Sequence, residues 1–179
     1  MKKNGFTLFE VLVAISIIII FTGIVLLNYR ATGNQLALQR AVFKLAADIR
    51  RVQEMAISSK EISGVGVPSG GYGIYFRNAN DTFYLIYADT NPPLSGNEQY
   101  DGGDTTVENN IELEKGVEIS TLSPANSLSI NFKPPDPAVK IKTGMGESDE
   151  TIITLRLITD TSKTKTIKVN KAGRIEIID

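Results

Sequence analysis

The segment that decides the fold is Lys3-Asn4-Gly5-Phe6-Thr7-Leu8-Phe9-Glu10, which joins a short basic stretch to a long apolar run. Between Phe6 and Leu27 the only ionisable side chain is Glu10. A carboxylate inside a membrane-spanning helix costs roughly 2.5 to 3.5 kcal/mol on insertion scales unless a partner neutralises it. The position of Glu10 therefore predicts a specific partner for its charge.

The apolar run is long enough to cross a membrane as a helix. Together with Phe6 to Leu8, Val11 to Leu27 supplies the roughly 20 residues that cross about 30 Å of hydrocarbon. A secretory signal peptide is the alternative, but its apolar core has only about 7 to 15 residues. The sequence therefore predicts an anchor in the cytoplasmic (inner) membrane. The short leader with Lys2 and Lys3 favours a cytoplasmic amino terminus and an exported carboxyl-terminal domain.

A second helical pattern follows the apolar run. Its apolar residues recur at spacings of three and four: Leu38, Val42, Leu45, Ile49, Val52 and Ala56. This stripe predicts that one long helix continues to about Ser58, with the stripe packed on its own domain and the opposite face in water. A coiled coil is the competing interpretation, but the stripe covers fewer than three heptads and strands follow it.

Strand patterns occupy the rest of the chain. After a glycine-containing loop at 60–71, Tyr72–Phe76 and Phe83–Ala88 predict a hairpin, and another hairpin is predicted at the carboxyl terminus. Residues 133–137, followed by 144–146, are predicted to be an irregular surface excursion. Further strands are expected at Val117–Ile119, Leu128–Phe132, Thr151–Ile158, Thr166–Val169 and Arg174–Ile178. The fold class predicted is α+β: a long amino-terminal helix, half transmembrane and half amphipathic, packed on one antiparallel sheet.

The first ten residues resemble the class III leader of type IV pilins and type II secretion pseudopilins. That leader consists of a basic stretch followed by Gly, Phe, Thr, Leu, any residue and Glu, and it matches Lys2 to Glu10 here. The 45–58 stretch, the Gly-Tyr-Gly-Ile-Tyr-Phe hairpin and the Lys-Ala-Gly-Arg-Ile ending are most similar to H-type pseudopilins and FimT-like minor pilins.

The resemblance implies a processing site and an assembly site. Prepilin peptidase would cut between Gly5 and Phe6 and methylate the new amine of Phe6, while Glu10 and Thr7 would serve assembly. The partners implied are other pilin or pseudopilin subunits, an inner-membrane assembly platform and membrane lipid. The implied organisation is a leader at 1–5, a transmembrane helix at 6–29, an amphipathic helix at 30–59 and a β-rich exported domain at 60–179.

Composition argues against catalysis and against nucleic-acid binding. The 179 residues include no cysteine and no histidine, which excludes disulfides, histidine-based catalytic triads and histidine or cysteine zinc sites. The formal charge is −1, from 19 basic and 20 acidic residues, so no global positive field attracts nucleic acid. These absences argue against an enzyme, and the resemblance to pilins implies a structural protein.

One loop carries the residues of a candidate calcium site. Asp89, Asn91, Asp101 and Asp104 supply oxygen ligands of the type that calcium prefers, although the spacing is not that of an EF-hand. A solvated loop is the alternative. These residues support a competing function, a membrane-anchored extracytoplasmic binding module that depends on calcium. An anchored hydrolase that uses Asp and Glu is a third hypothesis, but no carboxylate pair marks a site for it.

Overall fold

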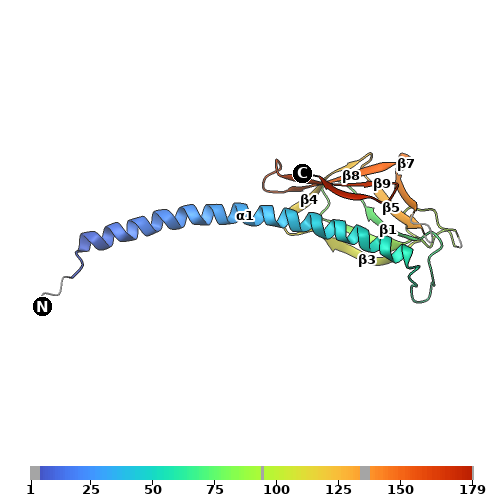
Figure 1. Ribbon diagram of the computed structural model, residues 1–179, viewed down its shortest axis with the longest axis horizontal. Coiled ribbons are helices and arrows are strands. Elements are labelled where there is room, and N and C mark those ends of the chain that lie inside the picture. Colours follow the sequence, from blue (N-terminus) through green and yellow to red (C-terminus); the bar gives the residue numbers. More distant parts are fainter. Residues whose placement is uncertain (1–4, 94, 134–137, 179) are drawn as a thin grey trace. The chain divides into compact units, whose positions relative to one another are not determined.

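One helix and ten strands make up the computed structural model (Figure 1), which describes residues 5–93, 95–133 and 138–178. Helix α1 spans Leu8–Ile57, and no helix-breaking proline interrupts it. The chain divides into two compact units, Met1–Leu36 and Ala37–Asp179, and α1 contributes to both. The α+β class expected from the sequence is confirmed. Most of the leader lies outside the described residues.

The second half of α1 buries the predicted stripe. Every member of the stripe is almost fully inaccessible to solvent, and Leu45, Ile49 and Val52 are completely so. They join one hydrophobic core with inward-facing residues of the strands, such as Ile74 and Ile153. Burial of a Leu or Ile side chain contributes about 1.5 to 3 kcal/mol, so this face holds the helix on its domain.

The strands form two antiparallel sheets rather than the single sheet predicted. The six-stranded sheet has the order β3-β2-β1-β5-β6-β7 and the four-stranded sheet the order β10-β9-β8-β4. The strands are β1 (Tyr72–Phe76), β2 (Phe83–Ala88), β3 (Thr105–Glu112), β4 (Val117–Ser123), β5 (Leu128–Lys133), β6 (Ala138–Thr143), β7 (Gly146–Ser148), β8 (Glu150–Leu157), β9 (Thr164–Asn170) and β10 (Ile175–Ile178). Because one face of each sheet supplies the core around α1, a single helix can bury both sheets.

The first predicted hairpin is confirmed residue for residue. β1 and β2 pair antiparallel, with Tyr72 opposite Ala88 and Ile74 opposite Ile86. Both of these pairs face the core, so the alternate residues of the two strands face away from α1. The carboxyl-terminal hairpin of β9 and β10 is confirmed as well.

The predicted excursion at 133–137 and 144–146 is wrong for Lys133 and Gly146, which lie in strands, and the strand between its two parts was not predicted. β6 pairs with β5 along Leu128–Lys133, and β7 pairs with β6. Ile141 in β6 is completely buried. Residues 134–137 of the expected excursion lie outside the described residues. The alternation of Val139 and Ile141 with Lys140 and Lys142 is the strand signal that the neighbouring prolines obscured.

Three of the four outer strands of the sheets are short or polar, and the fourth, β4, has seven residues. β7 has three residues and β10 has four. β3 is longer, but its middle residues Glu108, Asn109 and Asn110 are all exposed. These are the features by which natural sheets keep unpaired edges from joining other strands.

Candidate functional site

Thr7 and Glu10 form a reciprocal cap at the start of α1. Oε2 of Glu10 accepts hydrogen bonds from the backbone N–H of Thr7 at 2.8 Å and from its hydroxyl at 2.9 Å. The backbone N–H of Glu10 donates in turn to the Thr7 hydroxyl oxygen at 3.3 Å. This is the capping-box arrangement, in which a Thr and a Glu three residues later satisfy free N–H groups of the first helical turn.

The cap gives Glu10 hydrogen bonds but leaves its charge uncompensated. Both donors on Thr7 are neutral, and no cation among the described residues forms an ion pair with Glu10. Glu10 thus has a hydrogen-bonding partner within its own helical turn, in addition to the external partner predicted for its charge. The Thr-x-x-Glu spacing that marks a capping box was present in the sequence and was missed. The site residues Gly5 and Phe6 precede α1 and are exposed.

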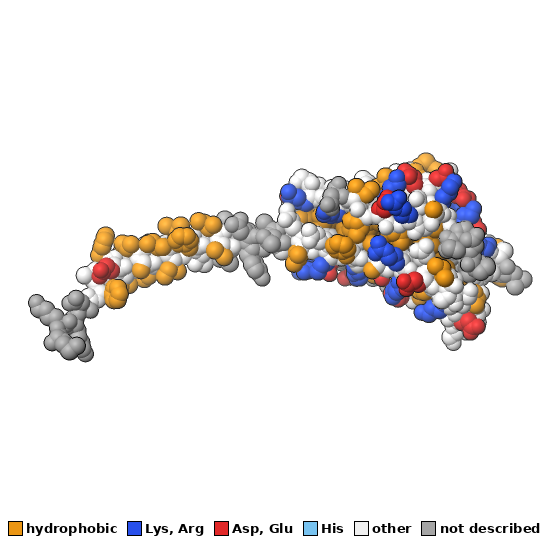
Figure 2. All heavy atoms as spheres, viewed as in Figure 1, with side chains coloured by type: hydrophobic (Ala, Val, Ile, Leu, Met, Phe, Trp, Pro, Cys, Tyr) orange, Lys and Arg blue, Asp and Glu red, His pale blue; other side chains and the backbone are white. Residues whose placement is uncertain are grey.

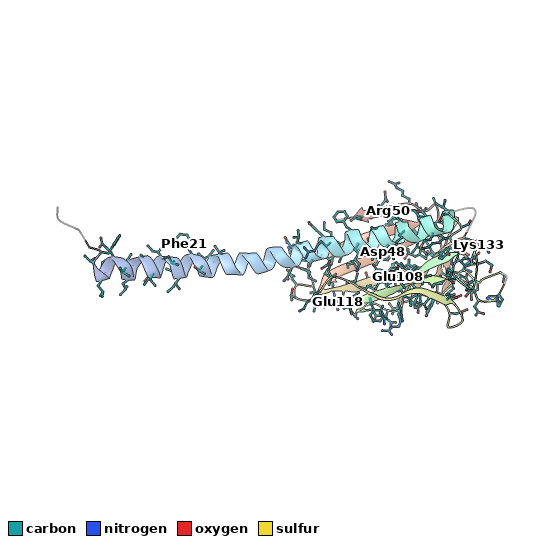
Figure 3. The ribbon with its side chains drawn as sticks, turned by 90° about the horizontal axis from the view of Figure 1, so that it is seen from below. Phe21, Asp48, Arg50, Glu108, Glu118 and Lys133 are labelled. Carbon is teal, nitrogen blue, oxygen red and sulfur yellow. The ribbon has the colours of Figure 1, made fainter. Side chains whose placement is uncertain are left out.

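The first half of α1 presents an apolar surface with nothing packed on it. Leu8–Val25 is an 18-residue stretch that is long and apolar enough to cross a membrane, and none of it is buried inside the chain. Ile18, Ile19 and Phe21 each expose more than 60% of their surface. Hydrophobic side chains dominate the face of this segment shown in Figure 2, and Phe21 points outward in Figure 3. Exposed apolar surface on this scale needs lipid or other helices around it.

The predicted calcium residues lie together in one loop, but their oxygens already accept hydrogen bonds within it. One oxygen of Asp104 accepts the backbone N–H groups of Thr90 at 3.0 Å and Asn91 at 3.1 Å. The other accepts the N–H of Asp101 at 2.8 Å. The amide of Asn91 donates to both carboxylate oxygens of Asp101, at 2.9 and 3.0 Å.

The carboxylate of Asp89 also accepts hydrogen bonds from within the loop. It is completely buried, and its carboxylate accepts the N–H groups of Asn97 at 3.0 Å and Glu98 at 2.5 Å. No group of three or more acidic side chains within the described residues is arranged to hold a metal ion. The four residues predicted as calcium ligands instead close the loop through backbone hydrogen bonds, and a calcium site is not supported.

The buried Asp89 makes stability depend on pH in a specific direction. Burial, which outweighs the bonds from Glu98 and Asn97, together with the nearby charges of Asp104 and Asp101, raises the pKa of Asp89 from 3.8 to about 6. The folded chain therefore holds this proton more tightly than the unfolded chain. The resulting stabilisation is complete below pH 3.8 and is lost as the pH rises through about 6.

We expect Asp89→Asn to remove this dependence. Between pH 4 and 6, the unfolding free energy of the wild type should fall relative to the variant by roughly 1 to 3 kcal/mol. Urea titrations of the full chain in detergent at several pH values measure the difference. Asp149→Asn is the control, since the side chain of Asp149 is 79% exposed. Parallel pH profiles for wild type and Asp89→Asn would show that Asp89 does not titrate in this range.

Polar contacts also tie α1 to the edge of the six-stranded sheet. Asp48 accepts a hydrogen bond from the hydroxyl of Tyr84 at 2.5 Å, and Arg51 binds both carboxylate oxygens of Glu108 at 2.8 and 2.9 Å. Figure 3 labels Asp48 on the helix and Glu108 on β3. Burial, followed by the bond to Asp48, raises the pKa of Tyr84, and the bond from Arg51 lowers the pKa of Glu108. Asp48 lies outside the apolar stripe, yet its side chain is only 16% exposed, so not every charged residue outside the stripe lies in water.

Comparison with known proteins bears on the amino-terminal segment. A family model described as the prokaryotic N-terminal methylation motif matches residues 1–26, which include the predicted processing residues, the cap and the start of the apolar helix. Neither a search of curated proteins nor a search of solved structures gave a match. The motif belongs to proteins that are generally structural rather than catalytic. The amino-terminal segment is thus similar to the prokaryotic N-terminal methylation motif, and the apolar stretch Leu8–Val25 lies within the matched residues.

Proposed function

We propose that this protein is a structural subunit of a type IV pilus or a type II secretion pseudopilus. The observation that carries the proposal is the methylation motif on a helix whose apolar surface is wholly exposed. Prepilin peptidase would remove residues 1–5 and methylate Phe6. The inner-membrane assembly platform would then move the processed subunit from the lipid into a filament of related subunits.

Apolar contacts would supply most of the assembly energy. In the membrane, lipid covers the side chains of Leu8–Val25. When a subunit leaves the bilayer, only apolar surface of other subunits can keep those side chains from water. Burial of each Leu, Ile or Phe contributes about 1.5 to 3 kcal/mol relative to exposure, so a bundle of such helices is strongly favoured over isolated ones.

The charge of Glu10 would select the position of the neighbouring subunit. Phe6 precedes α1, so the helix does not fix the position of its own amine, whereas Thr7 holds the Glu10 carboxylate at the first helical turn. An axially shifted neighbour can bring its methylated amine to the carboxylate that Thr7 already orients. In an apolar filament core a carboxylate and an ammonium group attract one another strongly, whereas either one alone is destabilising.

The processing step is tested by the mass of the mature protein. For protein purified from its native membrane, we expect an intact mass and an amino-terminal peptide that begin at Phe6 and carry one methyl group on the amine. Gly5→Arg should keep the leader, because a bulky cation would occupy the position next to the cut. A native protein that retains Met1 would contradict the proposal.

The proposal also covers the kind of filament and the topology of the subunit in the membrane. The likeness to H-type pseudopilins and FimT-like minor pilins favours a secretion pseudopilus or a minor position in a pilus, with the amino terminus cytoplasmic and the domain exported. The competing function, an anchored binding module, depended on a calcium site in the acidic loop. The oxygens of that loop already accept hydrogen bonds within it, so this function has no specific support. Replacing residues 6–27 by an unrelated spanning helix separates the two functions. A binding module would keep its activity after this exchange, and a filament subunit would not assemble.

A further inference from the structure

The outer face of the six-stranded sheet carries a small aromatic cavity that has no role in the proposed assembly. It measures about 190 Å³. Its lining comes from three neighbouring strands and the loops after β1 and β2, and consists of Tyr75, Arg77, Phe83, Tyr84, Leu85, Tyr100, Asn109 and Asn110. Tyr75, Phe83 and Leu85 lie on the face opposite the core, since they alternate with core residues such as Ile74 and Ile86.

The loop between β2 and β3 builds one wall of the cavity. Tyr100 packs on Tyr75 with ring centroids 4.7 Å apart and meets the edge of Tyr87 at 5.3 Å. Its backbone N–H donates to the hydroxyl oxygen of Ser129 at 3.1 Å. The closed acidic loop thus holds Tyr100 in place, and the aromatic wall exists before any ligand arrives.

A bulge in β3 brings two consecutive asparagines to the cavity. In a regular strand, Asn109 and Asn110 would point to opposite faces. The pairing of β2 with β3 shifts register around Ile86, and Asn110 has a left-handed backbone with φ 49°. Both asparagines therefore line the same cavity. Bulges that redirect side chains in this way are common beside binding sites.

The charge at the cavity is balanced. Arg77 pairs with Asp81 through two bonds, Nε to Oδ2 at 3.1 Å and Nη2 to Oδ1 at 3.3 Å. Its guanidinium also lies 4.9 Å from the ring centre of Phe83. Because this cation is already paired, the cavity has no free positive charge to attract a phosphate, a sulfate or a carboxylate.

From these observations we infer that the cavity binds one residue of a neutral glycan. Ligand pockets for larger molecules measure about 300 to 1,000 Å³, so this cavity suits a single sugar ring. The aromatic rings offer electron-rich faces to the C–H groups of the sugar. Each asparagine amide both donates and accepts hydrogen bonds, which matches hydroxyl groups that do the same. The exported domain of the proposed subunit would thereby hold on to a surface polysaccharide.

The test uses the full chain in a detergent without a sugar headgroup. An array of neutral hexose and N-acetylhexosamine oligosaccharides, with sialylated and sulfated members beside them, shows which class binds, and titration calorimetry with the best member gives the affinity. Asn110→Gly removes one amide and keeps the left-handed backbone, because glycine accepts positive φ readily. Asn109→Ala removes the other amide.

We expect neutral oligosaccharides to bind and each variant to weaken binding by about tenfold, as the loss of one or two hydrogen bonds would. Asn80→Gly is the matched control, since Asn80 also has positive φ, at 69°, but does not line the cavity. It should bind like the wild type. Binding of anionic members only, binding of none, or equal affinity in Asn110→Gly would each overturn the inference. Filament assembly does not enter this readout, so the result is separate from the proposed function.

Discussion

Glu10→Ala should leave the subunit in the membrane and lower its incorporation into filaments by about 100-fold or more. Removing one member of a buried charged pair costs about 3 to 5 kcal/mol, because the other charge stays buried alone, and each 1.4 kcal/mol corresponds to a factor of ten. Membrane insertion should not fall, since alanine is easier to place in lipid than a carboxylate. Immunoblots of sheared filaments and of washed membranes measure the two quantities in one culture.

Glu10→Gln separates the charge from the cap. A glutamine can accept the Thr7 N–H bond that Glu10 accepts at 2.8 Å, so the start of α1 should be unchanged. It cannot neutralise the amine of a neighbour. We therefore expect Glu10→Gln to fail in assembly nearly as badly as Glu10→Ala. Normal filaments from the glutamine variant would show that the cap matters and the charge does not, and normal filaments from both variants would refute the pairing.

Gly71→Ala should destabilise the exported domain by more than about 4 kcal/mol, which is exceptional for one methyl group. Gly71 has φ 94°, and an added Cβ would lie 2.8 Å from the Cα of Lys133 and even closer to the carbonyl of Phe132. Those atoms belong to β5, which pairs with β1 inside the six-stranded sheet, and they cannot move without breaking the sheet. Urea unfolding of the full chain in detergent, followed by tyrosine fluorescence, measures the loss.

Gly116→Ala is the control for backbone strain alone. Gly116 has φ 86°, but an added Cβ would meet nothing within 4 Å. The left-handed conformation costs a non-glycine residue about 1 to 2 kcal/mol, and we expect only that loss. If the two variants lost equal stability, the contact with β5 would not be the cause.

The sequence predicted those elements whose signals are local. The stripe around Leu45 and Ile49 repeats with helical period, and the hairpin of β1 and β2 combines aromatic strands with a polar turn. β3 was missed because Thr105–Glu112 is rich in Glu and Asn, a composition typical of loops. Thr105–Glu112 is a strand because β2 pairs with it, and the residues of β3 alone do not predict that pairing. The division into two sheets depends on equally distant pairings.

The candidate functional sites also differ in whether their sequence signals are local or depend on distant residues. The methylation motif and the cap between Thr7 and Glu10 are encoded within ten residues, so they can be recognised from spacing. The acidic loop was found as a cluster, but its chemistry was misjudged, since backbone N–H groups that the sequence does not place take up the oxygens of Asp89 and Asp104. The contact of Asp48 with Tyr84 joins residues 36 positions apart. No local sequence pattern predicts such a pair.

The outer strands β3 and β7 affect whether neighbouring copies can pair through their sheets. Under the proposed function, many anchored copies would bring their domains to high local concentration, where unpaired strand edges would join into irreversible aggregates. Three exposed polar side chains in the middle of β3, and only three residues in β7, deny a neighbouring copy a template. These two edges therefore disfavour strand pairing between copies and leave the exposed apolar helix as the surface for the proposed association.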